Sequence, residues 1–285
     1  AIQSLALEYR KLEGEIIVPT RAPGVHEGSP LDQPLMERGD YKKPLQPVAR
    51  RFLEVFDPRP YQPQGSGRLD LANSLADARN PLVNRVIVNR VWQQIFGQGI
   101  VRTPDNLGRL GEEPTHPELL DHLAAEFATQ KAGSLKELIR ALVTTATFRQ
   151  GSIPAAKMKE QDAENRQLTR FAPRRLEAEA IRDSLIAVSV GLDETHFGPS
   201  VAGNSRRRSI YVQVRRNSLD SLLSVFDAPE PSSALGKRDA TNVPAQSLTL
   251  LNDPFVIDLA SNWAKRTLAD TTLTTDAARV RRLLV

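Results

Sequence analysis

A polar loop between residues 102 and 116 holds the densest group of side chains suited to binding or acting on a small ligand: Arg102, Asp105, Asn106, Arg109 and His116. Together they supply guanidinium donors, carboxylate and amide acceptors, and an imidazole that can transfer protons. A rigid helical scaffold could present such a loop to a ligand. Alternatively, the Thr-Pro-Asp-Asn run is turn chemistry, in which Asp and Asn side chains bind the backbone, and we favour this second interpretation.

A second group of candidates is rich in arginine and comprises Arg206, Arg207, Arg208, Arg215, Arg216 and Asn217. Guanidinium groups bind phosphate, sulfate and carboxylate with two parallel hydrogen bonds, so this segment could hold an anionic polymer. The competing interpretation has two parts. The first run would be a solvated loop, and the second would pair with the carboxylates of Glu177, Glu179 or Asp227. For any single arginine we favour the competing interpretation.

Several other kinds of chemistry find no support in the sequence. There is no cysteine, and the four histidines are scattered, with His116 and His122 six positions apart rather than the three or four that share a helix face. No serine lies in a Gly-x-Ser-x-Gly turn. Tyr211 is the one aromatic residue among the arginines of 206–216, so the segment lacks aromatic interleaving, which argues against nucleic acid as a partner. We therefore predict no metal site and assign no catalytic residue.

The helices that position these residues carry clear start and stop signals. Asn80 and Pro81 suit the first turn of a helix that ends at Gly97. Two capping boxes, Thr115-His-Pro-Glu118 and Ser134-Leu-Lys-Glu137, predict the next two helices, the second over residues 135–147. The spacing of apolar residues predicts the buried faces of the three helices. These faces are Val86, Val91, Trp92, Ile95 and Phe96, then Leu119, Leu120, Leu123 and Phe127, then Leu138, Ile139, Leu142 and Val143.

The C-terminal half is predicted to be helical around one strand. Residues 175–190 form a helix that ends at Gly191, and alternation of Ile210, Val212 and Val214 with polar residues indicates a strand over 209–215. A short helix begins at Asn217 or Ser218 and ends at Phe226. Two helices follow, over 244–252 and 254–268, and a further short strand is expected at 16–18.

These patterns predict a mainly α fold, a multi-helix globular domain with a small β element and an extended proline-rich N-terminal arm. We expect residues 1–20 to be the tail of a preceding helical domain, 21–68 the arm or linker, and 69–285 the main helical domain, truncated at its C-terminus. The net charge is +4, and residues 166–216 hold ten arginines against five acidic residues, so the basic surplus lies in this segment. No apolar run approaches the ~18 residues of a membrane span.

Several phrases, in order along the chain, resemble one family. They are Asn80-Pro-Leu with Arg85-Val-Ile-Val-Asn-Arg-Val-Trp92, Gly99-Ile-Val-Arg-Thr-Pro-Asp-Asn-Leu-Gly108, Pro114-Thr-His-Pro-Glu-Leu-Leu120, Arg174-Arg-Leu-Glu-Ala-Glu-Ala-Ile-Arg-Asp183, Val214-Arg-Arg-Asn-Ser218, Phe226-Asp227 and Ala245-Gln-Ser-Leu-Thr-Leu-Leu-Asn-Asp253. Over about residues 25–268 the chain resembles the planctomycete PSD-one domain, a domain of unknown function. The resemblance implies an extracytoplasmic setting, periplasmic or exported, with upstream cytochrome c-like and companion helical domains in the same chain. It implies haem in the upstream domain, no cofactor in this segment, and no accepted catalytic residues.

Our first functional hypothesis is therefore a non-catalytic binding or docking module of a large exported, cytochrome c-associated protein, in contact with anionic polysaccharide through its arginines. The alternative is an enzyme, a hydrolase or redox partner acting on a polymeric extracellular substrate. Its site would be built from the 102–116 loop and the 215–227 segment, where five side chains would converge: Asp105, Arg109, His116, Arg215 and Asp227.

Overall fold

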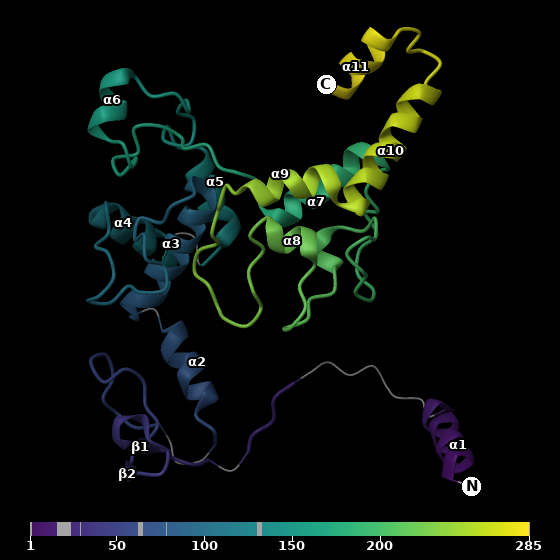
Figure 1. Ribbon diagram of the computed structural model, residues 1–285. Helices are drawn as coiled ribbons and strands as arrows, with labels where there is room; N and C mark the ends of the chain where they lie inside the picture. The colour runs from purple at the N-terminus through teal and green to yellow at the C-terminus, as the bar shows by residue number, and fades with distance from the viewer. Residues whose placement is uncertain are drawn as a thin grey trace. The chain divides into compact units, whose positions relative to one another are not determined.

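The computed structural model describes residues 2–15, 24–28, 30–61, 65–77, 79–129 and 133–284 (Figure 1). In this part of the chain eleven α-helices and a single two-stranded sheet are found, which confirms the mainly α fold with a small β element. None of the described helices is both long and apolar enough to cross a membrane. The strand expected at 16–18 lies outside the described residues.

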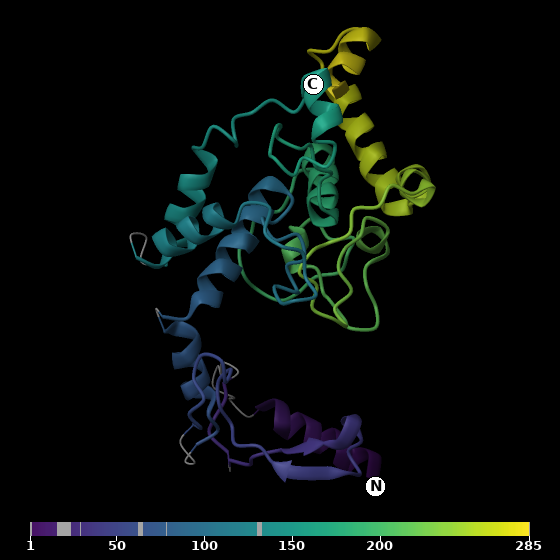
Figure 2. The ribbon, with the colours of Figure 1, turned by 90° about the vertical axis from the view of Figure 1, so that its left-hand side faces the viewer.

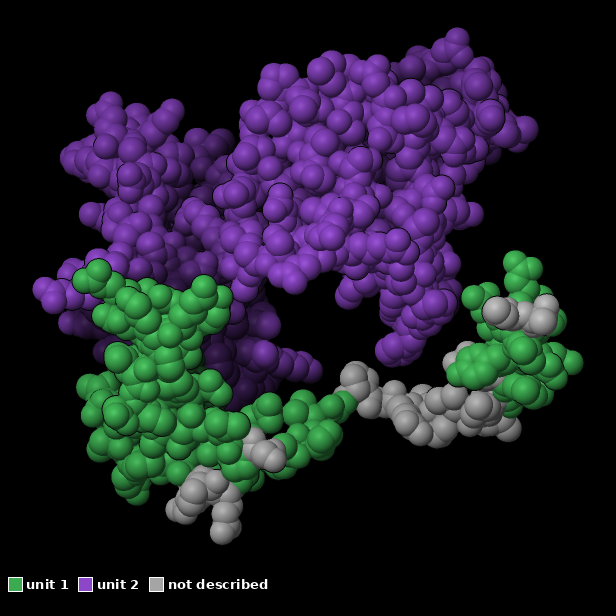
Figure 3. All heavy atoms as spheres, turned by 60° about the horizontal axis from the view of Figure 1, so that its bottom comes forward, with its two compact units in different colours: residues 1–83 green, residues 84–285 purple. Residues whose placement is uncertain are grey.

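The chain forms two compact units, residues 1–83 and residues 84–285 (Figure 3). Unit 1 contains helix α1 (Ile2–Glu15), strands β1 (Pro34–Met36) and β2 (Pro44–Pro47), the short 3₁₀ helix η1 (Glu37–Gly39) and helix α2 (Arg68–Ala76). The two strands pair antiparallel and are visible as adjacent arrows in Figure 2. Gly39, at φ 81°, lies in the turn between them, where a left-handed backbone favours glycine.

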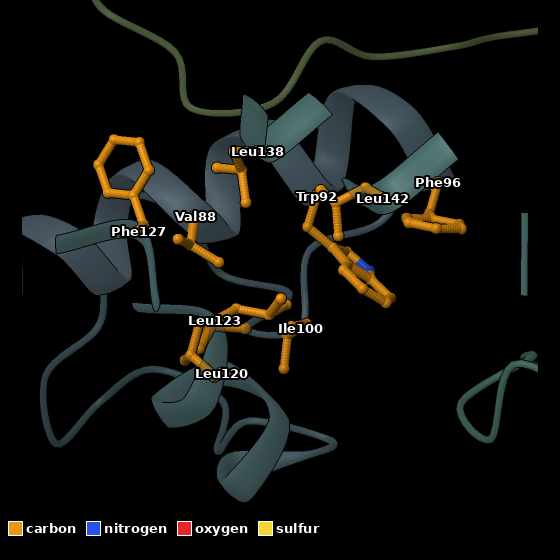
Figure 4. Packing of buried hydrophobic residues seen from close by; sticks show 10 residues of the cluster. Val88, Trp92, Phe96, Ile100, Leu120, Leu123, Phe127, Leu138 and Leu142 are labelled. Carbon is orange, nitrogen blue, oxygen red and sulfur yellow. The ribbon is translucent and has the colours of Figure 1, made fainter. Parts of the chain in front are cut away.

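The first core of unit 2 is built by three helices: α3 (Pro81–Phe96), which begins at the end of unit 1, α4 (Pro117–Ala128) and α5 (Leu135–Val143). Their apolar side chains point toward one another in Figure 4. The buried set is Val88, Trp92, Phe96, Ile100, Val101, Leu120, Leu123, Phe127, Leu138 and Leu142. Most of the predicted faces are confirmed, but Ile139 is exposed, and α5 ends at Val143 rather than Thr147.

The predicted signals at helix ends can be checked one by one. Asn80 Oδ1 accepts a hydrogen bond from the Leu82 N–H at 3.0 Å, and Gly97 lies at φ 86°, so both ends of α3 are confirmed. Ser134 Oγ accepts from the Glu137 N–H at 3.3 Å, as predicted. The capping box at Thr115 is wrong, because the Thr115 hydroxyl donates to the Ile100 carbonyl and leaves α4 without a side-chain cap.

The second core of unit 2 lies among α7 (Ala178–Ser189), α8 (Ser221–Val225), α9 (Pro244–Asn252) and α10 (Pro254–Ala269), which pack side by side in Figure 1. Ala178, Val212, Leu222, Leu223, Phe226 and Val256 form its buried set. The helices α6 (Ala156–Gln161) and α11 (Asp276–Leu284) complete the described elements. The cap of α8 is Asp220, whose carboxylate accepts from the Leu223 N–H, and not Asn217 or Ser218.

The strand predicted over 209–215 is wrong. Residues Ser209–Tyr211 form the 3₁₀ helix η2, and only Val212 of the three alternating residues is buried. Ile210 is 75% exposed and Val214 is 64% exposed. The alternation of apolar and polar residues was therefore not the mark of a buried sheet face. The segment instead makes a single parallel bridge with the loop at Val201.

Candidate functional site

Most guanidinium groups of the arginine-rich segment are bound inside unit 2, chiefly to main-chain carbonyls. Arg206 donates to the carbonyls of Val190 and Gly191 at the C-terminal end of α7, at 2.5 to 3.1 Å. Arg207 donates to the carbonyls of Thr195, Phe197 and Pro199. Carbonyl oxygens at a helix C-terminus lack partners within the helix, so a nearby guanidinium satisfies them. Residues 206–207 are structural, contrary to the expected solvated loop.

Arg208 and the second run of candidates lie at the surface. Arg208, Arg215 and Asn217 are exposed, and their side chains have no polar partner among the described residues. Arg216 reaches the Ser232 carbonyl at 3.4 Å. The carboxylates that were predicted to pair with the second run bind other arginines: Glu177 and Glu179 both contact Arg238, and Asp227 contacts Arg175.

Arg182 is the arginine with the largest structural role, and the sequence did not single it out. It lies on α7 with a fully buried side chain, at 0% exposure. Its guanidinium donates to the carbonyls of Gly203, Ser205 and Arg207 and to Ser209 Oγ, at 2.5 to 3.1 Å. Asp183, at 3.3 Å, provides the balancing charge. Arg182 therefore ties the whole 203–209 loop to α7.

Asp227 fastens two loops of the second core. Its carboxylate accepts from Arg175 at 2.5 Å and from the N–H and hydroxyl of Thr241, both at 2.8 Å. The hydrogen bond from Arg175, together with those from Thr241, holds the pKa of Asp227 below its usual range despite partial burial. Arg175 also donates to the Thr241 carbonyl. With both oxygens of Asp227 accepting hydrogen bonds from Arg175 and Thr241, the carboxylate is a structural tie.

The 102–116 loop follows the turn interpretation at Asn106 and departs from it at Asp105. Asn106 Oδ1 accepts from the Gly108 N–H at 3.1 Å, and Asp105 Oδ2 accepts from the Gly236 N–H at 2.6 Å. His116 precedes α4 and contacts the Thr115 hydroxyl at 3.0 Å. Arg109 is exposed, without a polar partner in the described part of the chain. Both side chains therefore hold backbone in place, Asn106 within its own turn and Asp105 through a long-range contact with Gly236.

The five residues of the enzyme hypothesis are not joined to one another. Among the described residues, no hydrogen bond or ion pair joins any two of Asp105, Arg109, His116, Arg215 and Asp227. Asp105 and Asp227 are bound to main-chain groups of different loops. A nucleophile, a base and its orienting group require mutual hydrogen bonds, and these five residues make none.

Arg102, by contrast, lines a small pocket together with two further arginines. The pocket has a volume of about 160 Å³, and its wall includes the rings of Trp92 and Phe96 as well as the side chains of Arg102, Arg166 and Arg170. One carboxylate, Glu164, also lines it. Arg102 and Arg166 each approach Glu164 Oε2 only to 3.5 Å, which is longer than a normal charge-assisted hydrogen bond.

The best hydrogen bonds of Arg102 and Arg170 go to uncharged oxygens. Arg102 donates to the Glu164 carbonyl at 2.8 Å. Arg170 donates to the carbonyls of Asp162 and Ala163 at 2.9 and 2.7 Å. Arg166 also reaches Glu112, again at 3.5 Å. A carbonyl orients a guanidinium without cancelling its charge, so Arg102 and Arg170 keep their positive charge at the pocket wall, whereas Arg166 lies near the carboxylates of Glu112 and Glu164.

The loop that carries Arg166 and Arg170 is held by two local side chains. Asp162 accepts from the N–H groups of Arg166 and Gln167 and from the Thr169 hydroxyl, at 2.6 to 3.1 Å. Burial tends to raise the pKa of Asp162, but these hydrogen bonds outweigh burial and lower it. Asn165, at φ 55°, binds both the N–H and the carbonyl of Arg170. The loop therefore presents both arginines from a fixed backbone.

The sequence analysis named Arg102 as a candidate ligand-binding residue of the 102–116 loop, but it did not name Arg166 or Arg170. The available signal was the arginine surplus that begins at residue 166, combined with Asp162 and Asn165, which favour tight turns just upstream. The distance in sequence between Arg102 and this loop concealed their proximity. Trp92 and Phe96, which form the aromatic wall of the pocket, were predicted only as core residues.

Comparison with known proteins adds the family. No curated protein and no solved structure matches the chain. The sequence model of the PSD1 family matches residues 67–285, which include all of unit 2 and therefore both cores and the arginine pocket. The chain belongs to this family, PSD1, which is described as proteins of unknown function (DUF1553).

Proposed function

We propose that this chain is a non-catalytic binding module for an anionic saccharide, with the pocket of Arg102, Arg166 and Arg170 as its binding site. The observation that carries the proposal is the charge balance of the pocket. Three guanidinium groups line it against one carboxylate, and the shortest hydrogen bonds of Arg102 and Arg170 go to carbonyls. The proposed contact with an anionic polysaccharide therefore lies at this pocket and not at residues 206–208, where the sequence suggested it.

The size of the pocket decides how much of a ligand it holds. Sites for drug-sized ligands occupy roughly 300–1,000 Å³. At about 160 Å³ the pocket suits one charged group and the ring that bears it, such as a uronate or a sulfated sugar unit. Planar guanidinium groups match carboxylate and sulfate oxygens bidentately. A longer polymer would extend from the pocket over the surface.

The proposed setting rests on the resemblance. We propose that the chain is part of a larger exported protein, with cytochrome c-like and companion helical domains upstream and haem confined to the cytochrome c-like domain. In such a protein a saccharide-binding module would hold the upstream domains at a polymeric substrate. Neither a cofactor nor a metal ion is proposed for this segment.

The proposal is tested by titrating the protein with glucuronate, galacturonate and a sulfated glucosamine, followed by calorimetry, with glucose as the uncharged control. Replacing Arg166 by Gln removes one charge from the pocket while leaving its backbone hydrogen bond to Asp162 in place. We expect Arg166→Gln to weaken binding about tenfold or more, the cost of one charge-assisted hydrogen bond.

The matched control is Arg109→Gln, because Arg109 is exposed and carries the same charge outside the pocket. It should bind the anionic sugars as the unaltered protein does. Raising the salt from about 0.05 M to about 0.3 M should weaken binding to the unaltered protein more than to Arg166→Gln. Equal losses in the two variants, or equal binding of glucose and glucuronate, would contradict the proposal.

A further inference from the structure

Phe197 is displayed on the surface by a backbone conformation that phenylalanine rarely adopts. Its side chain is 84% exposed, and its φ is 63°, in the left-handed region. There the Cβ atom approaches the following carbonyl oxygen, so a residue other than glycine needs support from its surroundings. Gly198, at φ 92°, continues the turn. The strained backbone at Phe197 does not serve to bury its side chain, so we look for its role in contact with another molecule.

The loop around Phe197 is fixed by two side chains from the 207–211 segment. The Phe197 N–H donates to the Tyr211 hydroxyl at 3.0 Å. Arg207 donates to the carbonyls of Thr195, Phe197 and Pro199, at 2.5 to 3.1 Å, and its guanidinium lies 4.0 Å from the centre of the Tyr211 ring. The backbone on both sides of Phe197 is therefore held, which fixes the direction in which its side chain leaves the loop.

The same unit also carries a groove that is apolar and acidic. It has a volume of about 440 Å³ and lies beside α7, α8 and residues 228–238. Its apolar wall is formed by Val212, Val214, Leu219, Leu223 and Leu235. Three carboxylates, Glu179, Asp220 and Glu230, line it against one arginine, Arg238, which is itself shared between Glu177 and Glu179.

We infer that Phe197 of one copy of this chain inserts into the groove of a second copy. The groove is larger than a single side chain requires, and its apolar wall removes the phenyl ring from water. The charges are complementary: residues 192–211, which carry Phe197, hold three arginines against Asp193 and Glu194, while the groove has an excess of carboxylates. This contact uses none of the three arginines of the proposed saccharide pocket, so it stands independently of that function.

The contact predicts weak, reversible self-association, which sedimentation velocity detects from about 1 µM to about 300 µM, where encounters of low to moderate affinity are populated. Phe197→Ala should weaken it about thirty-fold or more, as truncation of a central aromatic anchor does. Leu235→Asp, on an exposed stretch of the groove wall, should weaken it similarly. Leu110→Ala is the matched control, since Leu110 is 92% exposed and lies outside the groove.

The decisive measurement is a mixture of the two defective variants. Phe197→Ala keeps an intact groove and Leu235→Asp keeps an intact phenyl ring, so an equimolar mixture should associate although neither variant does alone. Circular dichroism and thermal melts of each variant, matched to the unaltered protein, separate loss of contact from loss of fold. A monomeric unaltered protein over the whole range, unchanged association of Phe197→Ala, or a mixture that stays monomeric would overturn the inference.

Discussion

Replacing Arg182 by Met tests whether one buried guanidinium holds the 203–209 loop to α7. Methionine keeps an unbranched apolar stem inside the core but removes every donor. The carbonyls of Gly203, Ser205 and Arg207 then lose their partner. Each buried polar group left unpaired costs about 1–3 kcal/mol. Relief from the desolvation of a buried cation offsets part of this sum, so we expect a net loss of about 3–5 kcal/mol, the range typical of breaking a buried pair.

Urea denaturation at neutral pH measures the effect. With a slope of about 2–3 kcal/mol per M, the unfolding midpoint should fall by about 1–2.5 M at an unchanged slope. Arg208→Met is the matched control, because Arg208 lies in the same segment but is exposed, and its cost should stay within about 0.5 kcal/mol. If the two variants unfold at midpoints within about 0.3 M of each other, the carbonyls do not depend on Arg182, and the reasoning fails.

Three further predictions rest on single polar side chains. Asn89→Leu should cost about 2–4 kcal/mol of unfolding free energy in the same denaturation assay. The buried Asn89 amide binds both the N–H and the carbonyl of Val101, and leucine would leave both unpaired. A cost below about 1 kcal/mol would contradict this prediction. Asp227 has a lowered pKa in the folded state, so its contribution is present above its unfolded pKa of about 3.9 and is lost as the pH falls through the folded value. Asp227→Asn should therefore flatten the loss of unfolding free energy that begins below about pH 5, and an unchanged pH profile would refute the tie to Arg175. In unit 1, the guanidinium of Arg59 lowers the pKa of Asp57 to about 2, which a carbon-detected NMR titration should reproduce, whereas a midpoint near the usual 3.8 would show the pair to be open.

Signals that act within one turn of a helix could be predicted from the sequence. Asn80, Pro81 and Gly97 each satisfy or release a backbone group of their own helix, so their effect does not depend on the rest of the fold. Thr115 shows the limit of this reasoning. Its hydroxyl donates to the Ile100 carbonyl, fifteen residues away in sequence. A Thr-x-x-Glu sequence whose hydroxyl binds such a distant partner cannot be distinguished, from the sequence, from one that forms a capping box.

The 209–215 segment shows a second limit. Alternation of apolar and polar residues predicts a strand only if a neighbouring strand is present to pair with it. Here the neighbours are α7 and the 201–207 loop, which bind the segment through Ser209 and through a single bridge at Val201. The chain therefore turns through η2, and Ile210 is left exposed.

The arginines show why the candidate site itself could not be predicted in full. Whether a guanidinium faces a carboxylate, a carbonyl or water depends on which loop ends within its reach, and that is settled by the fold rather than by neighbours in sequence. Arg206 and Arg182 donate hydrogen bonds to main-chain carbonyls and have a structural role. Arg102 and Arg170 also bind carbonyls, yet they line a pocket, where an orienting partner that leaves the charge intact prepares them for an anion. A hydrogen bond from a guanidinium to a carbonyl therefore has a structural role at Arg206 and Arg182, and it orients a binding group at Arg102 and Arg170. The difference is that a pocket lies beside Arg102 and Arg170.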